Sequence, residues 1–198
     1  MKEIPSVDKI VSRLGGGDKT EGSCASLGFC YIGQKNGVDV LDFRDGESRA
    51  MFSYGCRNIL RGIAQETGKP LLIEPNKSGT GGAVRLIKQC QPGKEYYFVV
   101  GRHAAIVRKV DDHYEYLELQ NAYRNGWKQF GEDEYYRDGK YTLGRTFEHR
   151  FACSRHIDGE AMMMDIEDMK NSKLLQRSWG YMNTAEDAQH KGATGHER

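Results

Sequence analysis

The stretch 101–120, GRHAAIVRKVDDHYEYLELQ, decides the fold that we predict. Two runs rich in β-branched and aromatic residues flank Asp111-Asp112, a pair of turn-forming residues, and this pattern is typical of an antiparallel hairpin. If the turn centres on the two aspartates, the numbers of facing residues sum to 223, so His103 faces Gln120. Glu118 is then the diagonal neighbour of His103 on the same face of the sheet.

The rest of the chain supplies helices around this hairpin. Helical periodicity predicts helices over residues 1–14, 23–36, 51–65, 83–90 and 165–179, and short apolar runs predict strands over 38–43, 71–74, 95–100, 102–110 and 113–120. We expect a flexible loop over 76–82 (NKSGTGG) and core packing for Met162–Met164, whereas the pattern over 122–145 does not favour a particular element. Helices followed by an antiparallel meander indicate an α+β fold.

Composition narrows the function classes. The chain has 198 residues, which predicts a single domain, residues 1–183, followed by a tail over 184–198 that is too polar to fold. The net charge is +1, so nothing favours nucleic acid as a partner. No apolar run reaches the length of a membrane span, and charges interrupt the N-terminal segment, so it lacks the apolar core of a signal peptide.

Five cysteines with scattered spacing do not predict a disulfide framework, so we expect thiols kept in a reducing compartment. Cys24 stands out because Ser23 is a good helix N-cap and Gly37 is a good helix stop. The N-terminus of a helix lowers the pKa of a thiol, and a thiolate is a nucleophile. The alternative for Cys24 is a buried structural cysteine.

A thiol nucleophile needs a base and a group that orients the base. Among the six histidines, His103 has the most informative position, because the hairpin register gives it Glu118 and Gln120 as neighbours. The alternative is an ordinary polar face of a sheet. The combination is more specific than its parts, because a thiol that opens a helix, a histidine on a later strand and an acid on the next strand follow the chain order of papain-like cysteine hydrolases.

The segments SCASLGFCYIGQKNGVDV and GRHAAIVRKVDDHYEYLELQ resemble papain-fold bacterial toxin domains, a group that includes glutamine deamidases. The resemblance covers about residues 20–121. In that family a cysteine opens a helix that ends in glycine, and the strand after the histidine commonly ends in Asp-Pro-Gln. Here Glu118 and Leu119 replace the Asp and the Pro.

The resemblance implies a papain-like fold, with N-terminal helices packed on the C-terminal β-meander. It implies a Cys24–His103–Glu118 catalytic triad, with Gln120, Ser23 and Asn121 orienting neighbours or contacting substrate. The implied function is a toxin or effector that deamidates protein glutamine or cleaves a peptide bond, with no cofactor and no metal. An immunity protein is the implied partner. A classical signal peptide is not expected, so we expect secretion or injection and action in the cytoplasm of the target cell, with the periplasm as the alternative.

Three other interpretations stay open. A peptidoglycan amidase of the same fold family uses the same thiol and imidazole. A non-catalytic interaction module on a degenerate papain-like scaffold is consistent with the two replacements at Glu118 and Leu119. His149, Cys153 and His156 have helical spacing and include zinc-ligand types, although a fourth ligand is not evident.

Overall fold

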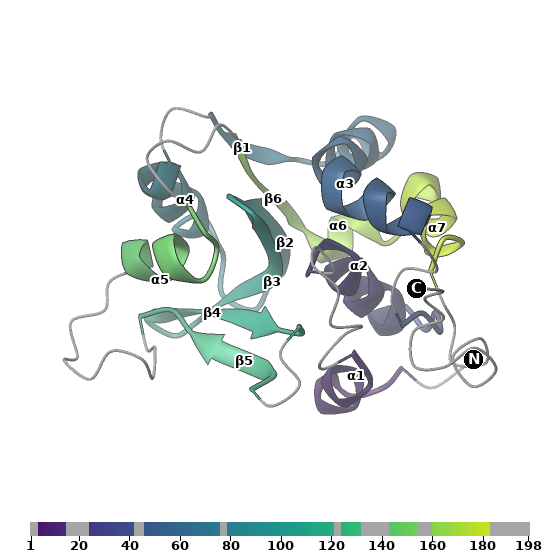
Figure 1. The fold of residues 1–198 in the computed structure, drawn as a ribbon, viewed down its shortest axis with the longest axis horizontal. Coiled ribbons are helices and arrows are strands. Elements are labelled where there is room, and N and C mark those ends of the chain that lie inside the picture. Colours follow the sequence, from purple (N-terminus) through teal and green to yellow (C-terminus); the bar gives the residue numbers. More distant parts are fainter. Residues whose placement is uncertain are drawn as a thin grey trace. The chain divides into compact units, whose positions relative to one another are not determined.

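The computed structural model of the chain describes residues 4–14, 24–41, 46–75, 79–120, 124–131, 143–153 and 160–182 (Figure 1). These residues form two units. The first takes its residues from 1–69, 118–126 and 167–198, and the second from 70–117 and 127–166. The fold is a mixture of helices and an antiparallel sheet, as the α+β prediction requires.

The first unit is helical. Its helices are α1 (Val7–Leu14), α2 (Cys24–Lys35), α3 (Gly46–Thr67), α6 (Ile166–Met169, of which Ile166 groups with the second unit) and α7 (Lys173–Trp179). α1 has the predicted amphipathic pattern, since Ile10, Val11 and Leu14 are buried while Ile4 remains exposed before the helix begins. α2 is instead buried on every side from Ala25 to Gln34, which makes it the centre of this unit.

α2 ends as the sequence predicts. Gly37 has a φ of +75°, and the N–H of Val38 donates to the carbonyl of Gly33, so a left-handed glycine closes the helix. Gly33 inside the helix has a different reason. A Cβ atom there would lie 2.5 Å from Val40 Cγ2 and 3.1 Å from the indole Nε1 of Trp179. Glycine therefore lets the chain after the helix and α7 approach α2 closely.

A carboxylate joins α3 to α7. Glu66, near the end of α3, accepts hydrogen bonds from Ser172 Oγ at 2.5 Å, from Lys173 N at 3.0 Å and from Leu174 N at 3.1 Å. These backbone donors belong to the first turn of α7 and have no partner within the helix. Ser172 also caps α7 directly, because its hydroxyl accepts from Leu175 N. Two side chains thus fix where α7 begins.

The second unit is built on a six-stranded sheet in the order β1-β6-β2-β3-β4-β5. Its strands are β1 (Leu72–Glu74), β2 (Glu95–Val100), β3 (His103–Val110), β4 (His113–Glu118), β5 (Gly126–Gln129) and β6 (Ala161–Asp165), of which Glu118 and Gly126 group with the first unit. The predicted meander is present as β2-β3-β4. The predicted register is confirmed, because Val110 pairs with His113 and Ile106 pairs with Leu117, so facing numbers sum to 223. Asp111 adopts a left-handed φ of 48° in the turn.

Two helices, α4 (Gly79–Ile87) and α5 (Leu143–His149), pack together in this unit (Figure 1). They share a hydrophobic core with one face of the sheet, to which β2 contributes Phe98 and β6 contributes Met163. The aromatic side chains of Phe130, Phe147 and Phe151 contact one another within this core, and the Phe130 and Phe151 rings are stacked. All of Met162–Met164 are buried, as predicted.

Several local predictions are wrong within the described residues. Residues 38–41 form no strand, because the Val40 carbonyl accepts from the Gln34 side chain instead of a neighbouring strand. Gly79–Gly82 begin α4 rather than belonging to a loop. The segment 165–179 is not one helix: residue 165 ends β6, and the Ser172 cap separates α6 from α7. The tail 184–198 lies outside the described residues.

Candidate active site

Cys24 is the first residue of α2, at the position that the sequence predicts. All five cysteines are described, and none is part of a disulfide. Cys24 is partly exposed, whereas Cys30, Cys56, Cys90 and Cys153 are buried. The first turn of α2 carries no acidic residue, so no carboxylate of that turn opposes the positive end of the helix dipole. Ser23, its predicted N-cap, lies outside the described residues.

His103 is the first residue of β3 and is buried, with 8% of its surface exposed. Its ring lies edge-on against the ring of Phe151. Burial is the main reason that its pKa falls from 6.5 to about 3, and the charge of Arg150 lowers it further. The imidazole is therefore neutral at physiological pH, and a pKa this low makes it a weak proton acceptor.

The backbone that leads to His103 is tightly packed. Gly101 has a φ of +57°, and a Cβ atom there would lie 2.4 Å from the carbonyl oxygen of Phe151. The same oxygen accepts from Arg102 N at 3.1 Å, and Ala152 has a left-handed φ of 47°. These contacts fix the start of β3. Gly101, two residues before His103, was the one sequence feature that indicated a tight junction here. Nothing in the neighbouring sequence indicated that Phe151 or Arg150 would lie near His103.

Glu118 ends β4 and is buried, with 5% of its surface exposed. Its Oε1 accepts from the backbone N–H of Gln120 at 2.8 Å, so these two predicted site residues lie together. The β3–β4 pairing described ends at Ile106 and Leu117, before it reaches His103. Asn121 lies outside the described residues.

The predicted triad takes its members from both units: Cys24 and Glu118 belong to the first and His103 to the second. The Cys24–His103–Glu118 arrangement therefore stays a prediction. Two members taken alone have a fitting local setting, namely a partly exposed thiol at a helix start and a carboxylate with a defined orientation. The third, His103, is neutral but has a pKa of about 3, which is low for a catalytic base.

The zinc interpretation loses its helical basis. α5 ends at His149, and the left-handed φ of Ala152 interrupts any helix before Cys153. His156 lies outside the described residues. Among the residues that the structure describes, no group of three or more His, Cys, Asp or Glu side chains is arranged to hold a metal ion.

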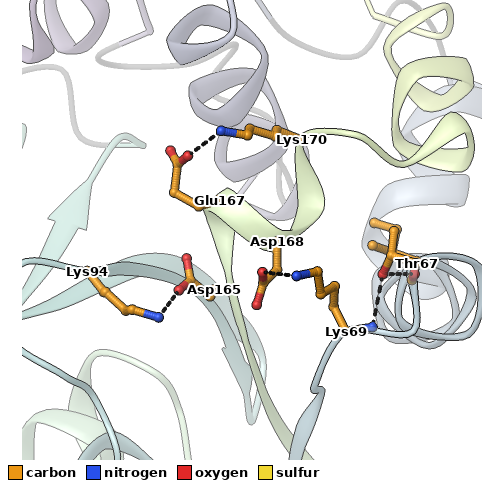
Figure 2. Close-up of polar contacts among 8 residues, drawn as sticks. Thr67, Lys69, Lys94, Asp165, Glu167, Asp168 and Lys170 are labelled. Carbon is orange, nitrogen blue, oxygen red and sulfur yellow. Dashed lines mark hydrogen bonds and ion pairs between the residues drawn. The ribbon is translucent and has the colours of Figure 1, made fainter.

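A pocket of about 680 Å³ lies in the first unit, lined by Glu66, Thr67, Lys69, Glu167, Asp168, Lys170, Asn171 and Lys173. Figure 2 shows two ion pairs at its wall: Lys69 with Asp168 at 3.3 Å and Lys170 with Glu167 at 2.8 Å. Glu66 is engaged by α7, as described above. Four charged side chains of the lining form these two ion pairs, and the lining contains no residue of the predicted triad.

The same figure draws one ion pair of the second unit, between Lys94 and Asp165 at 2.9 Å (Figure 2). Asp165 is the last residue of β6 and is buried, so the ammonium of Lys94 compensates a carboxylate that has lost most of its water. This pair is a structural feature of the sheet end.

No helix in the described ranges is both long and apolar enough to cross a membrane. Comparison with protein-family models, with curated proteins and with solved structures gave no match to this chain.

Proposed function

We propose that this protein is a cysteine hydrolase with a papain-like arrangement, which attacks a side-chain carboxamide or a peptide bond of a protein substrate. The observation that carries the proposal is the contrast among its thiols. Cys24 alone of the five cysteines is partly exposed, and it opens a twelve-residue helix whose N-terminal dipole stabilises a thiolate. A buried structural cysteine needs neither feature.

In the proposed reaction, Cys24 Sγ bonds to the carbonyl carbon of the amide. His103 takes the thiol proton and delivers it to the departing nitrogen, which leaves as ammonia or an amine. At a pKa of about 3 the imidazole keeps its lone pair but is a weak base, so this role requires that the carboxylate of Glu118 raise the pKa of His103 when substrate is bound. The imidazole then removes a proton from water as the thioester is hydrolysed. Glu118 orients the imidazole, and Gln120 contacts the substrate or positions Glu118.

The setting that we propose is that of a toxin or effector delivered into another cell, with an immunity protein as its inhibitor. The support for this setting is the resemblance of residues 20–121 to papain-fold toxin domains. The proposed reaction itself requires no cofactor. Peptidoglycan amidase activity is the neighbouring proposal, because it uses the same thiol and the same base.

The first experiment measures alkylation of each thiol by iodoacetamide from about pH 5 to about pH 9, with site assignment by mass spectrometry. We expect Cys24 to react faster than the four buried thiols below about pH 7, and His103→Ala to remove this advantage. His149→Ala is the matched control, since His149 is an exposed histidine at the end of α5. Equal reactivity of Cys24 and the buried thiols would contradict the proposal.

A second experiment separates the substrate classes. Purified protein and its Cys24→Ala variant are incubated with a mixture of cytoplasmic proteins and, separately, with purified cell-wall sacculi. Glutamine-to-glutamate conversion that depends on Cys24 supports a deamidase, and new peptide termini support a protease. Release of stem peptides from sacculi would instead support a peptidoglycan amidase and contradict both the deamidase and the protease assignments. A reactive Cys24 without any of the three products would favour the non-catalytic module.

A further inference from the structure

The chain contains two Asn-Gly dipeptides, Asn36-Gly37 and Asn125-Gly126. In such a dipeptide the amide nitrogen of the glycine can attack the side-chain carboxamide of the asparagine, because glycine has no side chain that hinders the approach. The two dipeptides also share their glycine geometry. Gly37 has a φ of +75° and Gly126 a φ of +94°, and nothing lies within 4 Å of the Cβ position of either. They differ in their hydrogen bonds and in their place in the fold.

The end of α2 holds the first dipeptide in place. The side-chain Nδ2 of Asn36 donates to the carbonyl of Ile32 at 2.7 Å, and the backbone N–H of Gly37 donates to the carbonyl of Gln34 at 3.0 Å. The nitrogen that would have to attack is therefore engaged, and the carboxamide cannot turn toward it without losing its own hydrogen bond. Reaction at Asn36 requires the end of α2 to open, and α2 is the central helix of the first unit.

The second dipeptide lies at the end of an edge strand. Gly126 is the first residue of β5, and β5 is the last strand in the order of the sheet, so in the described part of the chain it is paired along one side only. Asn125 precedes the strand, is partly exposed and has no hydrogen bond from its side chain to any described residue. The end of an edge strand opens at a lower free energy than the end of a buried helix. The nitrogen of Gly126 is therefore the more accessible of the two nucleophiles.

We propose that Asn125 is a site of spontaneous deamidation in the folded protein, whereas Asn36 is protected. The Gly126 nitrogen gives its proton to solvent and bonds to Cγ of Asn125, the bond from Cγ to the side-chain nitrogen breaks, and ammonia leaves with a proton from solvent. The product is a cyclic succinimide. Water then opens the ring at one of its two carbonyl carbons and yields aspartate or isoaspartate. The net reaction consumes one water and releases one ammonia, with no change of oxidation state.

The modification changes the start of β5. Both products introduce a carboxylate at position 125, and isoaspartate also lengthens the main chain by one carbon immediately before the strand. Two contacts of this part of the sheet are then at stake. The guanidinium of Arg108 lies 3.8 Å from the centroid of the Trp127 ring, and the N–H of Phe130 donates to the carbonyl of Tyr114 at 2.8 Å. Displacement of β5 along β4 weakens both contacts, so the edge of the sheet loosens as the protein ages.

The test incubates the full chain at neutral pH, once folded and once in guanidinium chloride, and follows both dipeptides over time by peptide mapping with mass spectrometry. In the folded protein we expect Asn125 to convert at least about tenfold faster than Asn36, because only Asn36 requires the end of α2 to open. In guanidinium chloride, where the helix is absent, we expect similar rates at both positions. Digestion with a protease that cuts before aspartate but not before isoaspartate separates the two products.

Asn125→Gln is the matched variant, since glutamine keeps the carboxamide but would have to close a larger ring, and it should abolish conversion at this position. Asn36→Gln should leave the rate at Asn125 unchanged, and so should Cys24→Ala, because the reaction needs no catalyst.

Three outcomes overturn the proposal: Asn36 converts as fast as Asn125 in the folded protein, Asn125 converts only in guanidinium chloride, or its conversion depends on Cys24. The comparison within the wild-type chain is decisive even if a variant fails to fold. This inference does not rest on the proposed function, since an inactive protein would still deamidate at Asn125.

Discussion

The imidazole of His103 stands edge-on against the phenyl ring of Phe151, with ring centroids 5.0 Å apart and an interplanar angle of 77°. Phe151 belongs to the aromatic core formed with Phe98, Phe130 and Phe147. The proposed base therefore borders an apolar cluster, and this contact explains why it loses water and stays neutral.

The first prediction concerns the proton affinity of His103. An NMR titration of the histidine ring protons should give a pKa of about 3 for His103. Arg150→Gln should raise this pKa by a small amount, because it removes a positive charge but leaves the burial unchanged. Phe151→Leu should raise it further if water enters beside the ring. A His103 pKa near 6.5 in the wild type would contradict the burial that we describe.

The second prediction links the same group to stability. Between pH 6.5 and about 3 the unfolded chain binds a proton at His103 that the folded chain does not bind. The free energy of unfolding should therefore fall as the pH falls through this window, and the full pKa shift corresponds to at most about 5 kcal/mol. His103→Leu should flatten this slope in urea denaturation, whereas the exposed control His149→Leu should leave it in place.

The third prediction tests the junction that fixes the start of β3. Gly101→Ala should lower the free energy of unfolding by about 1–3 kcal/mol, because it places a Cβ against the Phe151 carbonyl at a left-handed φ. Gly93→Ala is the matched control: Gly93 has a φ of +78° but nothing lies within 4 Å of its Cβ position. It should cost about 1 kcal/mol from backbone strain alone. Equal losses in urea denaturation would show that the Phe151 contact is unimportant.

The fourth prediction concerns the cap of α7. Glu66 has a lowered pKa, first because Ser172 donates to it and then because backbone N–H groups of α7 do. Its stabilising effect should be complete above its ordinary pKa of 4.5 and should be lost as the pH falls through its lower folded value. Glu66→Gln should therefore lower the melting temperature at neutral pH but not in strong acid. Glu167→Gln, which removes a surface ion pair, should have a smaller effect at neutral pH.

The fifth prediction compares two glycines inside helices. Gly33→Ala should destabilise the protein by about 1–3 kcal/mol, because its Cβ would overlap Val40 and press on Trp179. The indole fluorescence of Trp179 should change with it. Gly55→Ala in α3 is the control, since its Cβ position is open and alanine favours a helix by about 1 kcal/mol. A stabilising Gly33→Ala would contradict the close approach of α7 to α2.

Local chemistry explains which parts of the fold could be predicted. Asp111 tolerates the left-handed turn conformation, so the aspartate pair fixed the β3–β4 register. Gly37 likewise marked the end of α2. Strand β6 was missed because AMMMD has neither β-branched residues nor alternation, and a short run buried on both faces does not differ from a helix by periodicity.

In the candidate site, too, features set by local sequence could be predicted and features set by distant residues could not. The position of Cys24 at the start of a helix depends on neighbouring residues, and it was predictable. The surroundings of His103 depend on Phe151 and Arg150, which lie far along the chain and follow a segment without a recognisable pattern. Burial of this kind is set by tertiary packing, so the neutral state of the imidazole could not be obtained from the sequence.

The place of β6 between β1 and β2 has a consequence for how the protein is made. Both neighbours leave the ribosome long before residues 161–165, so until then each presents an unpaired edge toward a strand that has not been synthesised. The β1 side of the sheet therefore closes late, when β6 inserts between β1 and β2 at a large sequence separation from β1. Nascent chains that stop before β6 should therefore depend on chaperones and aggregate through those two edges.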